Sequence, residues 1–73
     1  MTHEEACKAI WSNLDHCKLH KITQTTMSAE YATAYGEDYA DFIVRAAMDR
    51  KMEALEIGIT DKALTFRLRH LGA

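Results

Sequence analysis

The C-terminal segment of this chain, residues 54–73, constrains the fold more than any other because its apolar residues and a glycine follow a tight spacing. Gly58 can adopt the left-handed conformation that ends a helix. If the segment is helical, its apolar residues share one core on either side of a turn, which predicts two short helices joined by a tight turn. The apolar residues concerned are Ile57, Ile59, Leu64, Leu68 and Leu71.

A β-hairpin over residues 54–69 is the alternative for this segment. Apolar and polar residues alternate in two short runs, and alternation in so short a window does not separate strand from helix. The flanking residues favour helix, because Thr60 is a good N-cap and Gly72 stands where a helix would stop. The alternating apolar residues are Leu55, Ile57 and Ile59 in the first run and Leu64, Phe66 and Leu68 in the second.

The segment resembles the DNA-binding end of the factor for inversion stimulation and of the nitrogen-regulator class of enhancer-binding activators. Those families share a small residue, a Gly-Ile pair and two leucines four residues apart. The resemblance is confined to residues 54–73 and implies a helix-turn-helix whose second helix, about residues 60–71, enters the major groove of double-stranded DNA, with a homodimer reading two half-sites. The matching positions are Ala54, Gly58, Ile59, Leu64 and Leu68.

The resemblance also implies which side chains would face DNA. Lys62 and Arg69 would contact bases or phosphates, the other basic side chains would hold the DNA backbone, and Thr60 and Thr65 would make shorter polar contacts. Asp61 departs from the family pattern, which has basic or small polar groups early in this helix. The expected DNA-binding residues are Arg50, Lys51, Thr60, Lys62, Thr65, Phe66, Arg67 and Arg69.

Helices are also expected ahead of this segment. Thr2 and Glu5 match a capping box, which predicts an amphipathic helix over about residues 3–20. Residues 21–26 are β-branched and polar, and so predict a connection or a short extended piece. A second helix is expected from Ser28 to Tyr35.

A third helix is expected to start near Asp38 and to end at Met48, because its apolar residues recur with helical spacing. Asp49 can cap a further short helix from Arg50 to Ile57, or the third helix can continue unbroken from Asp38 to Ile57. These elements predict an all-α single domain, residues 1–73, folded as a bundle of four to five helices. Residues 1–48 would serve dimerisation or interaction, and residues 49–73 would form the helix-turn-helix.

Charge is distributed unevenly along the chain, whose formal net charge is −2. Residues 1–44 carry three basic residues against seven acidic ones, and residues 45–73 carry six against four. This asymmetry fits a DNA-facing end and a protein-facing end. No apolar run reaches membrane-spanning length and the first residues lack the layout of a signal peptide, so we expect a cytoplasmic protein with no membrane contact.

Catalytic, cofactor and metal sites are not expected. The sequence has no phosphate-binding glycine loop and no nucleophile elbow. His16, Cys17 and His20 lie close together, but a fourth ligand is hard to find because Cys7 is ten residues away. The sequence therefore predicts solvated histidines and two free thiols.

The alternative function is protein binding. In this interpretation the chain is a small interaction or inhibitor protein of a phage or mobile element, which binds a protein partner through its acidic, aromatic N-terminal half. The C-terminal pattern would then be only a compact corner of the fold. The residues expected at that interface are Trp11, Tyr31, Tyr35 and Tyr39.

Overall fold

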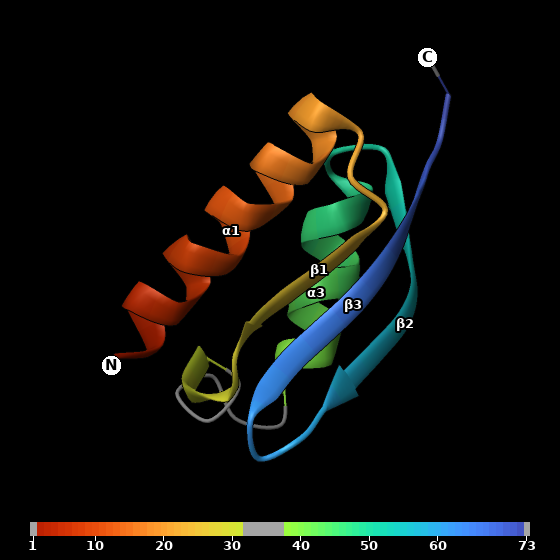
Figure 1. The fold of residues 1–73 in the computed structure, drawn as a ribbon. Helices are drawn as coiled ribbons and strands as arrows, with labels where there is room; N and C mark the ends of the chain where they lie inside the picture. The colour runs from red at the N-terminus through yellow and green to blue at the C-terminus, as the bar shows by residue number, and fades with distance from the viewer. Residues whose placement is uncertain (1, 32–37, 73) are drawn as a thin grey trace.

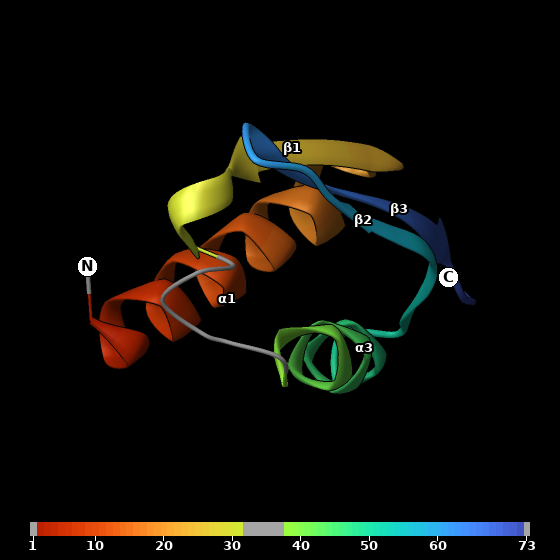
Figure 2. The ribbon, with the colours of Figure 1, turned by 90° about the horizontal axis from the view of Figure 1, so that it is seen from below.

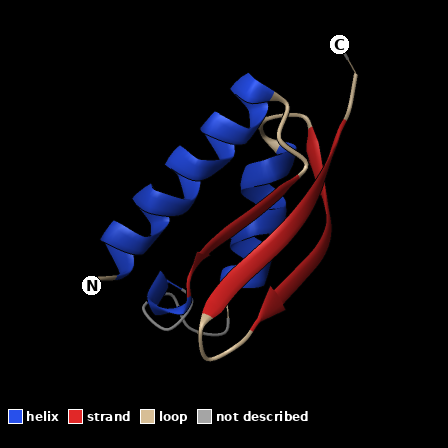
Figure 3. Ribbon diagram, viewed as in Figure 1, coloured by secondary structure: helices blue, strands red, loops and turns tan. Residues whose placement is uncertain are grey.

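The protein is an α+β domain in the computed structural model, which describes residues 2–31 and 38–72. The three strands form one antiparallel sheet in the order β1-β3-β2 (Figures 1 and 3). Both labelled helices lie on the same side of this sheet, as Figure 2 shows. In chain order the elements are α1 (His3–His20), β1 (Gln24–Ser28), α3 (Tyr39–Met48), β2 (Met52–Ile59) and β3 (Ala63–His70).

The predicted all-α bundle with a C-terminal helix-turn-helix is wrong, and the segment forms the alternative hairpin instead, as β2 and β3. A strand points Leu64, Phe66 and Leu68 to one side, and all three are buried. A helix would have placed Phe66 away from the two leucines. Burying a phenylalanine side chain stabilises the fold by about 1.5–3 kcal/mol. The strand gains this free energy by burying Phe66, whereas the helix would leave Phe66 away from the core.

The hairpin turn explains why Thr60 read as a helix cap. Its hydroxyl oxygen accepts hydrogen bonds from the backbone N–H groups of Lys62 and Ala63, at 3.2 and 3.1 Å. A threonine N-cap makes the same local bond to following N–H groups, so the residue alone does not distinguish a helix start from a hairpin turn. Gly58, expected to be left-handed at a helix end, lies inside β2 without a positive φ.

The N-terminal helices follow their predictions more closely. Helix α1 spans the predicted residues, and the Thr2 hydroxyl accepts from the Glu5 N–H at 3.1 Å. Helix α3 ends at Met48 as expected, but the predicted helix after Asp49 is replaced by a turn and β2. Residues 29–31 are helical, and most of the helix predicted from Ser28 lies outside the described residues.

Asn13 and Thr25 fasten α1 to the inner face of the sheet. The Asn13 amide donates to the Thr25 hydroxyl at 2.9 Å, and that hydroxyl lies 3.1 Å from the Asn13 carbonyl oxygen, to which it can donate in return. This pair therefore links α1 directly to the outer strand β1.

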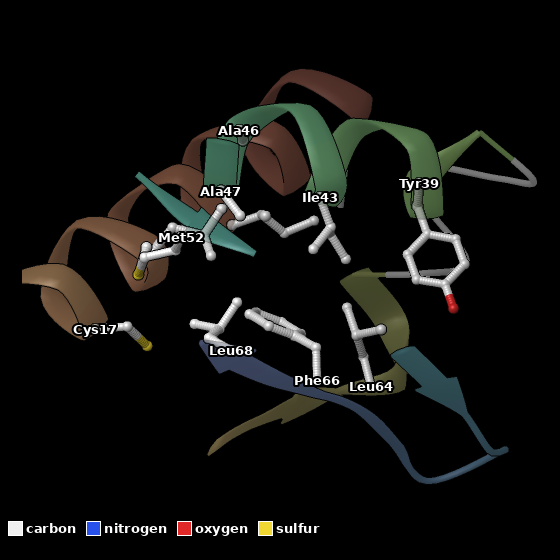
Figure 4. Close-up of a cluster of buried hydrophobic side chains, with 11 residues drawn as sticks. Cys17, Tyr39, Ile43, Ala46, Ala47, Met52, Leu64, Phe66 and Leu68 are labelled. Carbon is white, nitrogen blue, oxygen red and sulfur yellow. The ribbon is translucent and has the colours of Figure 1, made fainter. Parts of the chain in front are cut away.

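The core lies between the two helices and the inner face of the sheet (Figure 4). Phe66 is fully buried at its centre and points from β3 toward α3. The radius of gyration is 11.3 Å, close to the value of about 11 Å expected for one compact domain of this length. The buried residues that pack into this cluster are Ile10, Leu14, Cys17, Tyr39, Ile43, Ala46, Ala47, Met52, Leu64, Phe66 and Leu68.

Strand β2 carries a bulge at Leu55. Ala54 pairs with Leu68 and Glu56 pairs with Arg67, so Leu55 has no partner across the ladder. The bulge lets the inward positions on either side of it, Ala54 and Ile57, both face the core although they are three residues apart.

Replacing Phe66 with alanine should lower the free energy of unfolding by about 3–5 kcal/mol, because the change opens a cavity where both helices meet the sheet. Urea denaturation followed by circular dichroism measures this loss. Leu55→Ala is the control, because Leu55 is 47% exposed and its truncation should cost about 0.5 kcal/mol or less. Equal losses for the two variants would contradict this account of the core.

Replacing Lys51 with glycine should stabilise the fold by about 0.5–1 kcal/mol. Lys51 has a φ of 57°, a left-handed conformation that costs a residue with a Cβ about 1–2 kcal/mol. Glycine avoids this cost, but it also gives the unfolded chain more conformational entropy, which offsets part of the stabilisation. Lys62→Gly is the matched control, because Lys62 is also an exposed turn lysine but has no positive φ. The midpoint temperature of thermal unfolding should rise for the first variant and fall for the second. A change in the same direction in both variants would contradict the idea that Lys51 is strained.

Candidate functional site

The residues predicted to contact DNA do not gather on one surface. Thr60 and Lys62 lie in the turn at one end of the β2–β3 hairpin, while Lys51 lies at the other end, beside the Met52–His70 pair. Eight-residue strands separate the two ends by about 23 Å. Phe66, expected to face outward, is in the core. The helix that would have presented these side chains together is absent from the described C-terminal residues.

The open face of the sheet carries Arg67 and Arg69, but a glutamate on β2 pairs with each of them. Arg69 Nη2 lies 2.7 Å from an oxygen of Glu53, and Arg67 Nε lies 3.5 Å from an oxygen of Glu56. Exposed pairs of this kind add little stability, yet they cancel the charge that phosphates would need. The third arginine assigned to DNA, Arg50, bonds to Asp15 of α1.

Only part of the predicted aromatic interface is exposed. Tyr39 is buried in the core, Tyr31 is half-buried against it, and Tyr35 lies outside the described residues. Trp11 is 46% exposed, and its ring centroid lies 5.6 Å from that of Phe42. The exposed aromatic contact therefore joins α1 to α3 and does not follow the tyrosine series.

The outer sides of α1 and α3 form the surface that we call the helix surface, consisting of Trp11, Asp38, Asp41, Phe42, Val44, Arg45 and Met48. Val44 and Met48 are 41% and 51% exposed and lie one helical turn apart. A shallow depression at α3 is lined by Asp38, Asp41, Phe42 and Arg45. Phe42 therefore belongs both to this depression and to the contact with Trp11.

Val44, Met48 and Phe42 were not among the residues that the sequence predicted at an interface. The 3.6-residue period identified which helix residues are apolar, and the α3 residues that are buried do share one stripe: Tyr39, Ile43, Ala46 and Ala47. Val44 and Met48 stand outside that stripe. Apolar residues off the buried stripe of an amphipathic helix were the available signal for an exposed surface.

The helix surface carries uncompensated acids. Among the described residues, neither Asp38 nor Asp41 has an ion-pair partner within 4 Å. Both lie at the start of α3, where the helix dipole favours a carboxylate without neutralising it. Arg45 is the basic residue that lines the same depression. The balance of this region is acidic, in contrast with the paired charges on the open face of the sheet.

The described histidines and cysteines do not gather into a site with three or more metal ligands. In the part of the chain that the structure describes, no group of three or more His, Cys, Asp and Glu side chains could hold a metal ion. His16 and His20 lie side by side on α1, with ring centroids 4.4 Å apart. Both cysteines are free thiols. None of the described helices is long and apolar enough to cross a membrane.

Burial raises the pKa of the Cys17 thiol, and a hydrogen bond from Thr25 acts weakly in the opposite direction. Burial also raises the pKa of the Tyr39 hydroxyl. The pKa of Cys7 is raised by burial and, less strongly, by the charge of Glu4. A raised thiol pKa keeps sulfur protonated at neutral pH and unreactive as a nucleophile, so these groups do not indicate thiol catalysis.

Comparison with protein-family models, with curated protein sequences and with solved structures finds no significant match.

Stability should fall as the pH rises above about 8.5. Cys17 and Tyr39 hold their protons more tightly in the folded state, so the unfolded chain ionises first and rising pH stabilises it relative to the folded state. The slope contributed by one such group cannot exceed about 1.4 kcal/mol per pH unit. Cys17→Ala should flatten the decline that begins near pH 8.5, and Tyr39→Phe the one near pH 10.

Urea denaturation at several pH values measures these slopes, which separates them from the constant cost of each substitution. Unchanged slopes in both variants would show that neither group titrates with folding.

Proposed function

We propose that this chain is a small protein-binding module that docks a partner through its helix surface. The observation that carries the proposal is the contact between Trp11 and Phe42, which holds a half-exposed tryptophan beside the acid-lined depression of α3. Tryptophan is among the residues most enriched at the energetic centres of interfaces, because its large ring binds strongly when a partner removes it from water.

Two further exposed apolar side chains, Val44 and Met48, lie on α3 away from this contact, about 160° and 120° around the helix axis from Phe42. A single exposed apolar residue does not indicate a binding surface, because most protein surfaces contain several such residues. Here Trp11, Val44 and Met48 lie on the outer sides of the two helices, and a methionine side chain adapts readily to different partner shapes. The open face of the sheet offers mostly paired charges and hydroxyl groups, so it competes poorly as a docking surface.

The charges of the helix surface indicate the chemistry of the partner. Asp38 and Asp41 would attract lysine or arginine side chains, which steer encounter and fix the orientation of a complex. A second copy of the chain fits less well, because a symmetric interface sets each patch against itself and would bring these acids together. We therefore favour a different protein that presents an apolar surface with a basic rim.

Double-stranded DNA has less support as the partner. The exposed side of α3 would bring Asp41 toward phosphates, and the arginines of β3 are engaged by glutamates. Salt-dependent binding of duplex DNA to the purified chain would nevertheless overturn this preference.

The double variant Asp38→Asn/Asp41→Asn should weaken partner binding about tenfold or more, because it removes both uncompensated acids while asparagine still suits a helix start. Trp11→Ala should cost about 2 kcal/mol of binding free energy. The partner is first captured from cell extract by the wild-type chain and then purified. Binding is measured by calorimetry with the purified partner, and also by the fluorescence of Trp11, the only tryptophan in the chain.

The matched control is Glu53→Gln/Glu56→Gln, which changes net charge by the same amount on the open face of the sheet. This control should bind like the wild type. An equal loss of affinity in both double variants would show that only the overall charge matters. A loss of affinity in the control alone would show that the interface lies on the sheet. Circular dichroism and unfolding curves establish that each variant is folded.

A further inference from the structure

A pair of exposed histidines on α1 lies outside the helix surface. His16 and His20 are four residues apart, and their rings are tilted by 51° with centroids 4.4 Å apart. Five residues separate Trp11 from His16, which places them about 140° apart around the helix axis. The histidine pair and the proposed docking surface therefore lie on different sides of α1, and neither argument depends on the other.

We propose that His16 and His20 chelate one divalent transition metal ion of the zinc class. Two histidines at this spacing on one helical face are the arrangement by which the His-Glu-x-x-His helix binds zinc. Imidazole nitrogen suits zinc, copper and nickel, whereas calcium and magnesium prefer oxygen. The pair supplies two of the four ligands of a tetrahedral site, and water completes the other two.

The ring nitrogens of this pair are available to a metal ion. Both side chains are exposed, and within the described part of the chain neither ring makes a hydrogen bond. His70 is a useful contrast, because its Nε2 already lies 2.8 Å from the backbone oxygen of Ile22. A metal ion at His16 and His20 would therefore displace water and would break no bond within the protein.

Helix α1 holds the two imidazoles in place. The helix is anchored by buried residues through the turn that carries the pair, including Leu14 and Cys17, and it is closed by a backbone bond from Lys21 to Cys17. Its C-terminus carries partial negative charge, which favours a cation beside the last turn. The ammonium groups of Lys18 and Lys21 act against this attraction, so the expected site is weak compared with a closed structural zinc site.

Titration of the full chain with zinc chloride at about pH 7.5 tests the proposal. Isothermal calorimetry should report one zinc ion per chain, and the His16 and His20 ring proton resonances should shift together in NMR spectra. His16→Ala and His20→Ala should each weaken binding by about tenfold or more, since even indirect partners of a ligand are worth 10–100-fold.

His3→Ala is the matched control, because it removes one histidine from the same helix and leaves the pair intact. It should bind zinc as the wild type does. Absence of zinc binding, or equal losses in all three variants, would overturn the proposal. All three positions are exposed, so the variants should stay folded, and circular dichroism checks that they do.

Discussion

Strand β3 is the element on which the rest of the structure depends. It hydrogen-bonds to β1 on one side and to β2 on the other, and its inward residues Leu64, Phe66 and Leu68 are covered by both helices. Every other element is positioned by contact with this strand or with a neighbour of it. The alternation of three apolar residues along β3 therefore places α1 and α3 on one side of the sheet and leaves the other side open.

The two helices could be predicted from the sequence because several independent signals agree within each. A threonine cap, a glutamate three residues later and a helical apolar stripe all indicate α1. The hairpin could not be decided in the same way. Leu64 and Leu68 share a face in a helix and also in a strand, and the Thr60 hydroxyl makes similar local bonds in both structures. The burial of Phe66, which separates the two possibilities, depends on helices that are distant in sequence.

The candidate surface could also be predicted from the sequence only in part. Trp11 was expected at an interface and is exposed, but Tyr39 was expected there and is buried. Aromatic residues on an amphipathic helix satisfy the core and an interface equally well, and only the packing of the other elements decides between them. The surroundings of the charged residues likewise depend on how distant segments pair. Arg67 and Arg69 resembled phosphate ligands, yet the register of the hairpin places glutamates across from both.

The bulge at Leu55 affects how the sheet meets other chains. Strand β2 is an outer strand, and a regular outer strand of eight residues would offer its free N–H and C=O groups as a template for further strands. An unpaired residue near its middle bends that edge and breaks the regular spacing of those groups. The other outer strand, β1, has only five residues. Neither outer strand therefore offers a long, regular edge to which a further strand could add.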